Sequence, residues 1–376
     1  MQKNGFKELK PLVKKSKSGD KIAPNKTVMK YYTIDDFESV EKYDSHVHLN
    51  IREPGFIKQS EEDNFKLISI NVDVSSEFPT IDEQQDVAIK LSKTFAGIVN
   101  YASTFSVKNF NDDDWPQKTI TYLKNSFSKG AIAVKVWKNI GMELRDRHNN
   151  FVMIDHPKFD PIFDFLTKNN IPLIGHLGEP KNCWAPIEEM SVQGDVNYFS
   201  THPKYHMYLH PEYPGYEDQI NARDRMLEKH PGLQFIGAHL GSLEWNVDEL
   251  AKRLDKFPNM AVDTASRISH LQYQAKTNWQ KIHDFCMKYQ DRIIYGTDII
   301  IHPTDAPLEI KKTSHDIRLR HWNFFTSDEK MRVPKVEGEF KGLKLPRKVV
   351  DKIYRTNAQK WFKEVMKTKY SYSDKQ

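Results

Sequence analysis

Two histidines separated by one residue, His46 and His48, are the residues whose types and spacing best suit metal chemistry. Side chains alternate along a β-strand, so residues two apart point to the same face. The run Tyr43–His48 is typical of a short strand, which would aim both imidazoles into one space. Neutral imidazole is a common ligand of zinc and neighbouring divalent metals. The pair therefore predicts half of a metal site, whose other half must come from elsewhere in the chain.

Apolar runs and helical patterns alternate along the rest of the sequence. The predicted strands are Tyr43–His48, Lys66–Val72, Ala96–Ala102, Ala131–Val136, Ile171–His176, Leu233–His239, Met260–Thr264 and Arg292–Thr297. The predicted helices are Ile81–Thr94, Gln117–Phe127, Pro161–Lys168, Gln219–Lys229, Trp245–Phe257 and Trp279–Tyr289. Strand and helix alternating about eight times predict an α/β fold of the (β/α)8 TIM-barrel type. A doubly wound open sheet is the alternative, but no Gly-x-Gly-x-x-Gly follows an early strand.

The carboxyl ends of all strands of such a barrel face one mouth, where catalytic groups collect. Five predicted strands end in a residue that can bind a metal or carry a proton. These residues are His46 and His48 on the first strand, Lys135 on the fourth, His176 on the fifth, His239 on the sixth and Asp298 after the eighth. Each alone could be a buried histidine or a helix N-cap. Because these residues from five strands are expected to meet at one mouth of the barrel, they predict an active site.

Two connections are too long for simple loops. Residues 178–216 follow the fifth strand and are rich in aromatic side chains, and residues 299–345 follow the eighth. We expect lid insertions at both places. Residues 1–30 hold nine lysines against two acidic residues, which predicts a solvated, disordered tail. Residues 31–376 are expected to form a single catalytic domain.

Short motifs surround the candidate residues. They are His46-Val47-His48, Gly175-His176, Ala238-His239-Leu240-Gly241, Gly296-Thr297-Asp298 and, near the end of the chain, Asn357-Ala358-Gln359-Lys360-Trp361-Phe362. Together they resemble the motifs of the amidohydrolase superfamily, and most closely its amidohydrolase-related branch. That branch includes aminocarboxymuconate-semialdehyde decarboxylase and resorcylate decarboxylases. The resemblance covers roughly residues 40–365 and is specific for the superfamily, not for a substrate.

The resemblance implies a role for each residue. His46, His48 and His176 would be metal ligands, and Asp298 would be the acidic group beside the metal-bound water. His239 would orient or deprotonate that water, and Asp298 would carry its proton to the leaving group. A catalytic zinc needs three or four such ligands and one open position. Zn²⁺ is the first expectation for the cofactor, with Mn²⁺ or Fe²⁺ as alternatives, and the branch favours one ion over two.

Lys135 lies inside an apolar strand, where an unpaired ammonium is costly. Burial favours the neutral amine, which can form a carbamate and bridge two metals in binuclear members of the superfamily. A charged lysine that pairs with a substrate carboxylate or a neighbouring acid is the alternative. Asp44 and Glu244 are candidates for carboxylates that fix the imidazole tautomers, or they are ordinary exposed or capping acids.

Few residues hint at the substrate. Arg267, just past the seventh strand, could bind a carboxylate, and Trp137 and Glu179 are further candidates for substrate binding at the mouth. Arg145 and Arg147 could serve similarly, although surface arginines are the commoner case. These residues favour a small organic acid.

The leading hypothesis is a metal-dependent hydrolase of an amide, lactone or ester of a small polar acid. The first alternative is a metal-dependent, non-oxidative decarboxylase of a small aromatic acid, since both reactions use the same ligands. The second alternative is a barrel that binds a ligand without catalysis. All the candidate ligand residues are present in the sequence, which argues against a barrel without catalytic activity.

Charge, cysteine content and hydropathy restrict the partners and the compartment. The net charge of +5 arises in the first 30 residues, so it does not predict a nucleic-acid surface. No apolar run approaches 18 residues, so no membrane span is expected. Two cysteines favour a reducing, cytoplasmic location, although a leader removed before this chain begins would be invisible. Closed barrels of this kind often form homodimers, but nothing in the sequence names an interface.

Overall fold

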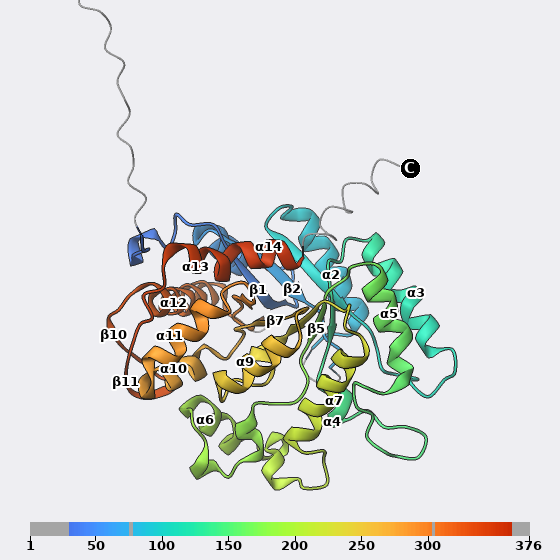
Figure 1. Ribbon diagram of the computed structural model, residues 1–376. Helices are drawn as coiled ribbons and strands as arrows, with labels where there is room; N and C mark the ends of the chain where they lie inside the picture. Colours follow the sequence, from blue (N-terminus) through green and yellow to red (C-terminus); the bar gives the residue numbers. More distant parts are fainter. Residues whose placement is uncertain (1–29, 75–77, 303–304, 363–376) are drawn as a thin grey trace, which may run out of the picture.

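The computed structural model describes residues 30–74, 78–302 and 305–362, and parallel strands surrounded by helices form its centre (Figure 1). The strands are β1 (Lys42–Leu49), β2 (Phe65–Ile70), β3 (Val99–Thr104), β4 (Val134–Val136), β5 (Leu173–Gly175), β6 (Phe235–Gly237), β7 (Met260–Asp263), β8 (Ile293–Ile294) and β9 (Ile299–Ile301). They pair in the order β8-β7-β6-β5-β4-β3-β2-β1-β9, always in parallel. The predicted TIM-barrel fold is confirmed, and every predicted strand overlaps an observed one.

The barrel closes between its first strand and a broken eighth strand. β8 and β9 are two pieces of this strand, separated by residues 295–298. Ser45 N donates to Tyr295 O at 3.0 Å, Asp298 N donates to His46 O at 2.7 Å, and β9 pairs with β1. This seam therefore places Asp298 beside the histidines of β1.

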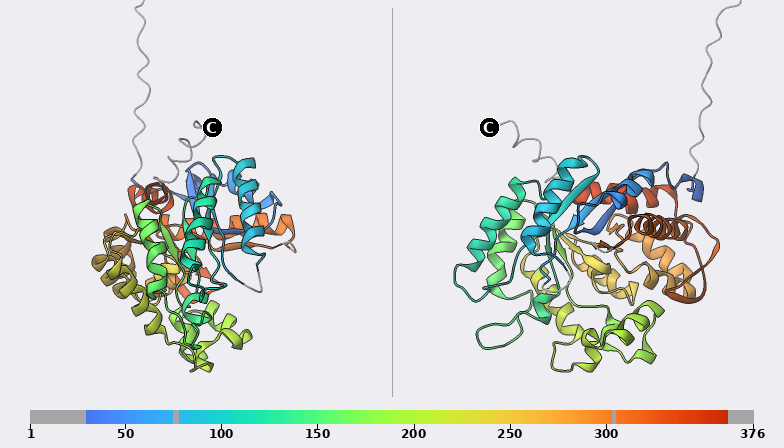
Figure 2. Two further views of the ribbon diagram at one scale, coloured as in Figure 1. Left: turned by 90° about the vertical axis from the view of Figure 1, so that its right-hand side faces the viewer. Right: turned by 180° about the vertical axis from the view of Figure 1, so that it is seen from behind.

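Helices cover the outside of the barrel (Figures 1 and 2). The predicted helices correspond to α2 (Ile81–Thr94), α3 (Trp115–Ser128), α5 (Asp160–Lys168), α7 (Tyr216–Lys229), α9 (Val247–Lys256) and α11 (Trp279–Lys288). Not predicted were α1 (Gly55–Glu62), α4 (Asn139–Met142), α6 (Gln193–Thr201), α8 (Ala238–Gly241), α10 (Ile268–Thr277), α12 (Pro307–Thr326), α13 (Arg347–Asp351) and α14 (Asn357–Trp361). Thr80 and Glu83 form a capping box that fixes the start of α2, in agreement with the predicted boundary.

The interior of the barrel is filled by inward-facing side chains of the strands, such as Ile68, Ile174 and Ile236, all buried. Ala358 and Trp361 of α14 belong to the same apolar cluster. Asn357 donates from Nδ2 to Gln290 O and to Ile293 O, both at 2.7 Å, which ties α14 to the start of β8. The closing motif of the sequence therefore plugs the barrel end away from the strands' carboxyl ends.

The predicted insertion after β5 consists of short turns around α6, with 3-10 helices at Lys181–Trp184, Ile187–Glu189, Pro203–Tyr205 and Met207–Leu209. Its buried Cys183, Phe199 and Met207 form a small apolar cluster with Met142. In Figures 1 and 2 this segment lies at the end of the molecule opposite α14. It therefore covers the mouth, as expected of a lid.

The connection after the eighth strand is a lid only in part, which corrects the expectation. Most of it is the 20-residue helix α12, which packs on α1 in the outer layer. The hairpin of β10 (Lys330–Val333) and β11 (Val336–Lys341) packs on α10 and reaches the mouth. The sequence pattern failed here because the inner face of α12 contains the buried Arg318, which counts as polar.

The lysine-rich segment 1–30 lies outside the described residues except for Lys30, so its disorder stays a prediction. The remaining short helices are 3-10 turns at Ile34–Asp36 and Pro157–Phe159 and a π-helical turn at Lys352–Thr356. Among the described helices, none combines the length and the apolar character that a membrane crossing requires.

Candidate metal centre and active site

His46 and His48 on β1 both present Nε2 to the mouth of the barrel. The Nδ1 atom of His46 lies 2.7 Å from Asp263 Oδ2, and Nδ1 of His48 lies 2.7 Å from the carbonyl of Ile70. An acceptor at Nδ1 holds the proton there and leaves a lone pair on Nε2. Both Nε2 atoms lie 3.3 Å from Asp298 Oδ1, so the pair meets its carboxylate partner.

Asp298 is held at the seam in a left-handed backbone conformation, with φ of 65°. Its Oδ2 accepts a hydrogen bond from Ser266 Oγ at 2.9 Å, while Oδ1 faces the imidazoles. Burial alone would raise the pKa of Asp298, but the imidazoles of His239, His48 and His46 hold this pKa well below its usual value. One potential ligand atom of His46, of His48 and of Asp298 lies within 4.8 Å of the others, a spacing that suits a single metal ion.

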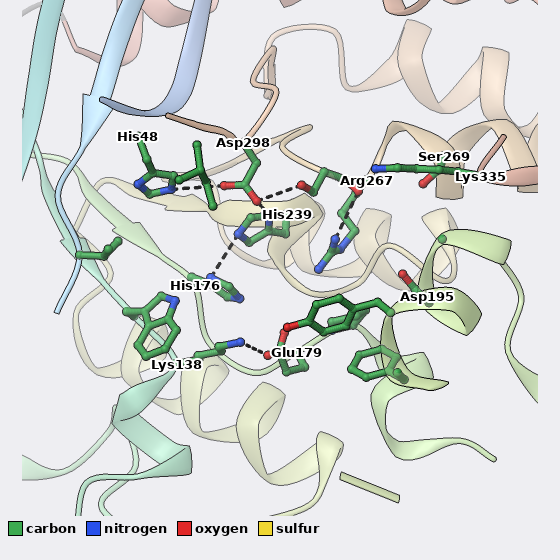
Figure 3. Close-up of a pocket in the computed structure, with 18 of the residues that line it drawn as sticks. His48, Lys138, His176, Glu179, Asp195, His239, Arg267, Ser269, Asp298 and Lys335 are labelled. Carbon is green, nitrogen blue, oxygen red and sulfur yellow. Dashed lines mark hydrogen bonds and ion pairs between the residues drawn. The ribbon is translucent and has the colours of Figure 1, made fainter. Parts of the chain in front are cut away.

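His176 and His239 lie against each other next to this cluster, with ring centroids 4.2 Å apart (Figure 3). His239 Nδ1 faces the carbonyl of Ala265 at 2.9 Å and must donate to it. Its Nε2 then accepts from His176 Nδ1 at 3.2 Å. The remaining lone pair of His176, on Nε2, is buried and has no partner among the described residues. The compact ligand group consists of His46, His48 and Asp298 and does not include the predicted ligand His176. The unpaired Nε2 of His176 can still accept a bond from a bound group.

Burial sets the protonation of these imidazoles. It lowers the pKa of His48, lowers that of His176 well below its ordinary value, and lowers that of His239 to about 3. The three rings are therefore neutral at neutral pH while Asp298 is ionised. Metal ligands must be deprotonated before they bind, so this set can accept a cation without releasing protons.

Asp263, at the end of β7, is the carboxylate that orients the histidines, and it was not predicted. Its Oδ2 is the partner of His46 Nδ1, and its Oδ1 accepts from the backbone N–H of His239 at 2.8 Å. Asp44 and Glu244, the carboxylates expected to orient the histidines, instead form hydrogen bonds with other groups. Asp44 binds Arg318 and Thr297, and Glu244 accepts from the backbone N–H of Lys181. Asp263 also ends a barrel strand, and that position was the available signal.

Lys135 is buried on β4, and its Nζ lies 3.3 Å from His46 Nε2. Burial lowers its pKa to about 8, although the carboxylates of Asp263 and Asp298 oppose this shift. The amine is thus next to the cluster, as its place on the strand predicted. Both of its expected roles, bridging carbamate and partner of a substrate carboxylate, stay predictions.

A cavity of about 410 Å³ opens beside the cluster and contains the three residues expected to bind substrate. Trp137 lies edge-on to His176, with ring centroids 6.4 Å apart. Glu179 forms an ion pair with Lys138, while Arg267 enters the cavity from the start of α10 (Figure 3). Lining residues that were not predicted include Phe78, Lys138, Asp195, Tyr198, Ser269 and Lys335. Apart from Ser269 on α10, they come from loops and insertions, and the sequence pattern does not reveal how these pack at the mouth.

Arg145 and Arg147 do not line this cavity. Arg145 stacks on Phe151, with its guanidinium carbon 3.7 Å from the ring centroid, and Arg147 pairs with Asp113 at 2.8 Å. Their expectation as substrate-binding residues is not supported by these positions.

The barrel with a cluster of imidazoles and a carboxylate at its mouth defines a class of metal-dependent TIM-barrel enzymes. The chain belongs to the amidohydrolase family, since residues 105–363 match the family model described as Amidohydrolase. The matched segment starts after His46 and His48 in the sequence. The structure places these two histidines at the same site. No curated protein matches the sequence significantly.

Solved structures with the same fold cover most of the chain at low identity. A 2,6-dihydroxybenzoate decarboxylase complexed with 2,6-dihydroxybenzoate has 15% identity and a TM-score of 0.51, covering 86% of this chain and 98% of its own. A 2,6-dihydroxybenzoate decarboxylase from Rhizobium has 16% identity and a TM-score of 0.50, with the same coverage of both chains. An amidohydrolase II structure has 13% identity and a TM-score of 0.50, covering 86% and 100%. Such low identity supports the fold alone.

Proposed function

We propose that the protein is a metal-dependent decarboxylase that removes CO2 from a small aromatic carboxylic acid without an oxidant. The observation that carries this proposal is one cavity in which the histidine and aspartate cluster faces cationic and aromatic side chains. Phe78 and Trp137 offer ring faces, and Lys135 and Arg267 offer positive charge. The decarboxylases that share this fold are named for such an acid, which makes the reaction the first to assay.

In this proposal His46, His48, His176 and Asp298 hold one divalent ion. The unpaired lone pair of His176 and the short spacing of the other three support this set. Zn²⁺ suits the three imidazoles, and the carboxylate permits Mn²⁺ or Fe²⁺. When bound, the ion would supply a Lewis acid that stabilises negative charge on the substrate.

The protein's own groups would orient the acid and move one proton. Decarboxylation breaks the bond between the carboxyl carbon and the ring, and the ring carbon gains a proton. Asp298, ionised at neutral pH, is proposed to take this proton from water and pass it to the ring carbon. His239, whose Nδ1 lies 3.9 Å from Asp298 Oδ2, is proposed to orient the carboxylate, and both residues face the cavity. The lid limits water around them, which strengthens every charge interaction in the cavity.

Hydrolysis of an amide, lactone or ester is the second candidate function. The observation in its favour is the ionised state of Asp298, whose pKa is held low by the neighbouring imidazoles after burial has opposed ionisation. An ionised carboxylate beside a bound metal can accept a proton from water. The two reactions share this site and are separated by their products.

The deciding experiment offers both substrate classes to the protein loaded with Zn²⁺, Mn²⁺ or Fe²⁺. We expect CO2 release from hydroxybenzoates that depends on metal and is lost in Asp298→Asn. Lys330→Met, on the exposed face of the β10–β11 hairpin, is the control and should keep full activity. Turnover of lactones or amides without CO2 release would replace the proposal by the second candidate. A protein that binds none of the metals would contradict both.

Elemental analysis of wild type and Lys135→Ala tests the number of ions. One metal per chain in both proteins would support a mononuclear site. Two metals in the wild type, with loss on substitution, would support the bridging carbamate.

A further inference from the structure

The cavity has a second charged end, across from His48 and His176. Figure 3 shows His48 and His176 on one side and Ser269 and Lys335 on the other, with the Arg267 guanidinium between them. Arg267 directly precedes α10, and Lys335 lies in the turn between β10 and β11. Two cations from separate elements therefore converge on one end of the cavity.

Neither cation is neutralised by a protein carboxylate in the described part of the chain. Arg267 donates only to the neutral carbonyl of Ser266, at 3.3 Å, and its Nε is buried without a partner. The nearest acid on the lid is Asp195. It is already engaged, because it accepts from Asn182 Nδ2 at 2.8 Å and lies 3.3 Å from His270 Nε2.

The two cations also repel each other. Burial and the nearby Arg267 guanidinium both lower the pKa of Lys335, and the charges of Asp195 and Asp298 oppose this shift. Like charges facing one cavity are costly unless an anion lies between them. The arrangement is therefore more favourable with a bound anion than without one.

Lys335 is exposed to solvent, but its position on the hairpin is fixed by packing. Its aliphatic stem packs on Gly194 of α6, where a Cβ would lie 3.3 Å from Lys335 Cγ. The hairpin is fixed to α10, since Lys276 Nζ donates to Glu337 O at 2.9 Å. The indole of Trp279 also donates to Gly342 O, at 2.9 Å. The lid and the hairpin thus meet at the residue that supplies the charge.

We propose that Arg267 and Lys335 bind a second anionic group of the substrate, so that the substrate is a small dicarboxylate. One carboxylate lies at the metal cluster, and the other lies between the guanidinium and the ammonium. Arginine binds a carboxylate through two parallel hydrogen bonds, and lysine adds a point charge from the opposite side. This inference rests on the proposed function for the first carboxylate only, because the second subsite contains no metal ligand.

Binding of matched dianions and monoanions tests the subsite directly. Isophthalate is compared with benzoate, and glutarate with butyrate, by calorimetry on zinc-loaded and on metal-free protein. We expect each dianion to bind at least about ten-fold more tightly than its monoanion. In Lys335→Met, which keeps the stem on Gly194, this preference should fall below about two-fold. Lys335→Arg should restore it, and Lys330→Met, the exposed control on the same hairpin, should leave it unchanged.

The subsite is overturned if neither dianion binds the wild type more tightly than its monoanion. It is also overturned if Lys335→Met weakens both ligands equally or neither. Its outcome is separate from that of the proposed function. A preference for dianions that depends on Lys335, in a protein that releases no CO2 from any acid, would keep the subsite and reject the decarboxylase.

Discussion

Replacing Arg318 by methionine removes one member of a fully buried ion pair behind the candidate active site. Arg318 Nη2 and Nε donate to Asp44 Oδ2 at 2.9 and 3.2 Å, and Nη1 donates to Ser60 Oγ at 2.8 Å. Asp44 in turn accepts from the backbone N–H of Thr297 at 2.9 Å and from its hydroxyl at 2.8 Å. Thr297 directly precedes Asp298, so α12 positions the acidic candidate ligand through this chain of contacts.

The expected cost follows from the charge that is left behind. Breaking a buried pair by removing one partner costs about 3–5 kcal/mol. Loss of the bond to Ser60 adds about 1 kcal/mol, whereas the two bonds from Thr297 continue to stabilise the Asp44 carboxylate. Methionine can also keep contact with Phe56 and Phe65, on which the guanidinium now stacks. We therefore expect the free energy of unfolding of Arg318→Met to fall by about 3–5 kcal/mol.

Equilibrium urea unfolding measures this loss, and chelator competition measures zinc affinity in the same protein. Arg320→Met, an exposed arginine on the same helix, is the control and should change stability by less than about 0.5 kcal/mol. The double variant Asp44→Asn/Arg318→Met should regain most of the loss, because no charge stays buried alone. A loss below about 1 kcal/mol in Arg318→Met, or no recovery in the double variant, would refute the reasoning.

Three further outcomes are expected. Gly296→Ala would bring a Cβ to 2.8 Å from His46 Cβ, so we expect almost no bound zinc and a lower Tm; normal zinc content by elemental analysis would contradict this. Asp263→Asn disturbs the bond that orients His46, and we expect zinc affinity to fall about 10–100-fold in chelator competition; unchanged affinity would assign Asp263 a purely structural role. Burial lowers the folded-state pKa of His176 and His239, so the unfolded chain binds more protons as pH falls. The stability of the metal-free protein should then be full above about pH 6.5 and decrease below it, by up to about 1.4 kcal/mol per pH unit for each histidine. Urea unfolding between pH 5 and 8 measures this slope, and a flat profile would contradict neutral burial.

The strands and the residues at their ends could be predicted because parallel strands are buried on both faces and leave continuous apolar runs. Each polar residue that ends such a run, like His176 after Leu173–Gly175, then has a defined place at the mouth. Asp263 ends a strand in the same way, but its partner His46 is 217 residues distant in the sequence. Local residue spacing cannot show which carboxylate pairs with an imidazole at such a distance along the sequence.

The second charged end of the cavity could not be predicted for a related reason. Lys335 reaches the cavity only because the β10–β11 hairpin packs on α10 and its stem fits against Gly194. Its sequence neighbourhood, rich in lysine and arginine, is indistinguishable from that of an exposed loop. Helix α12 was missed because one of its inward positions is Arg318, buried by its pairing with Asp44.

The break in the eighth strand has a consequence for how the protein assembles. Ser45 and Asp298 take part in the hydrogen bonds that join the first strand to the last, so the ligand cluster is complete only when this seam is closed. An ion bound by His46, His48 and Asp298 would link the first strand of the barrel to the broken eighth strand. Metal occupancy would then report ring closure, and chelation would first accelerate amide hydrogen exchange along this seam, before the rest of the barrel opens.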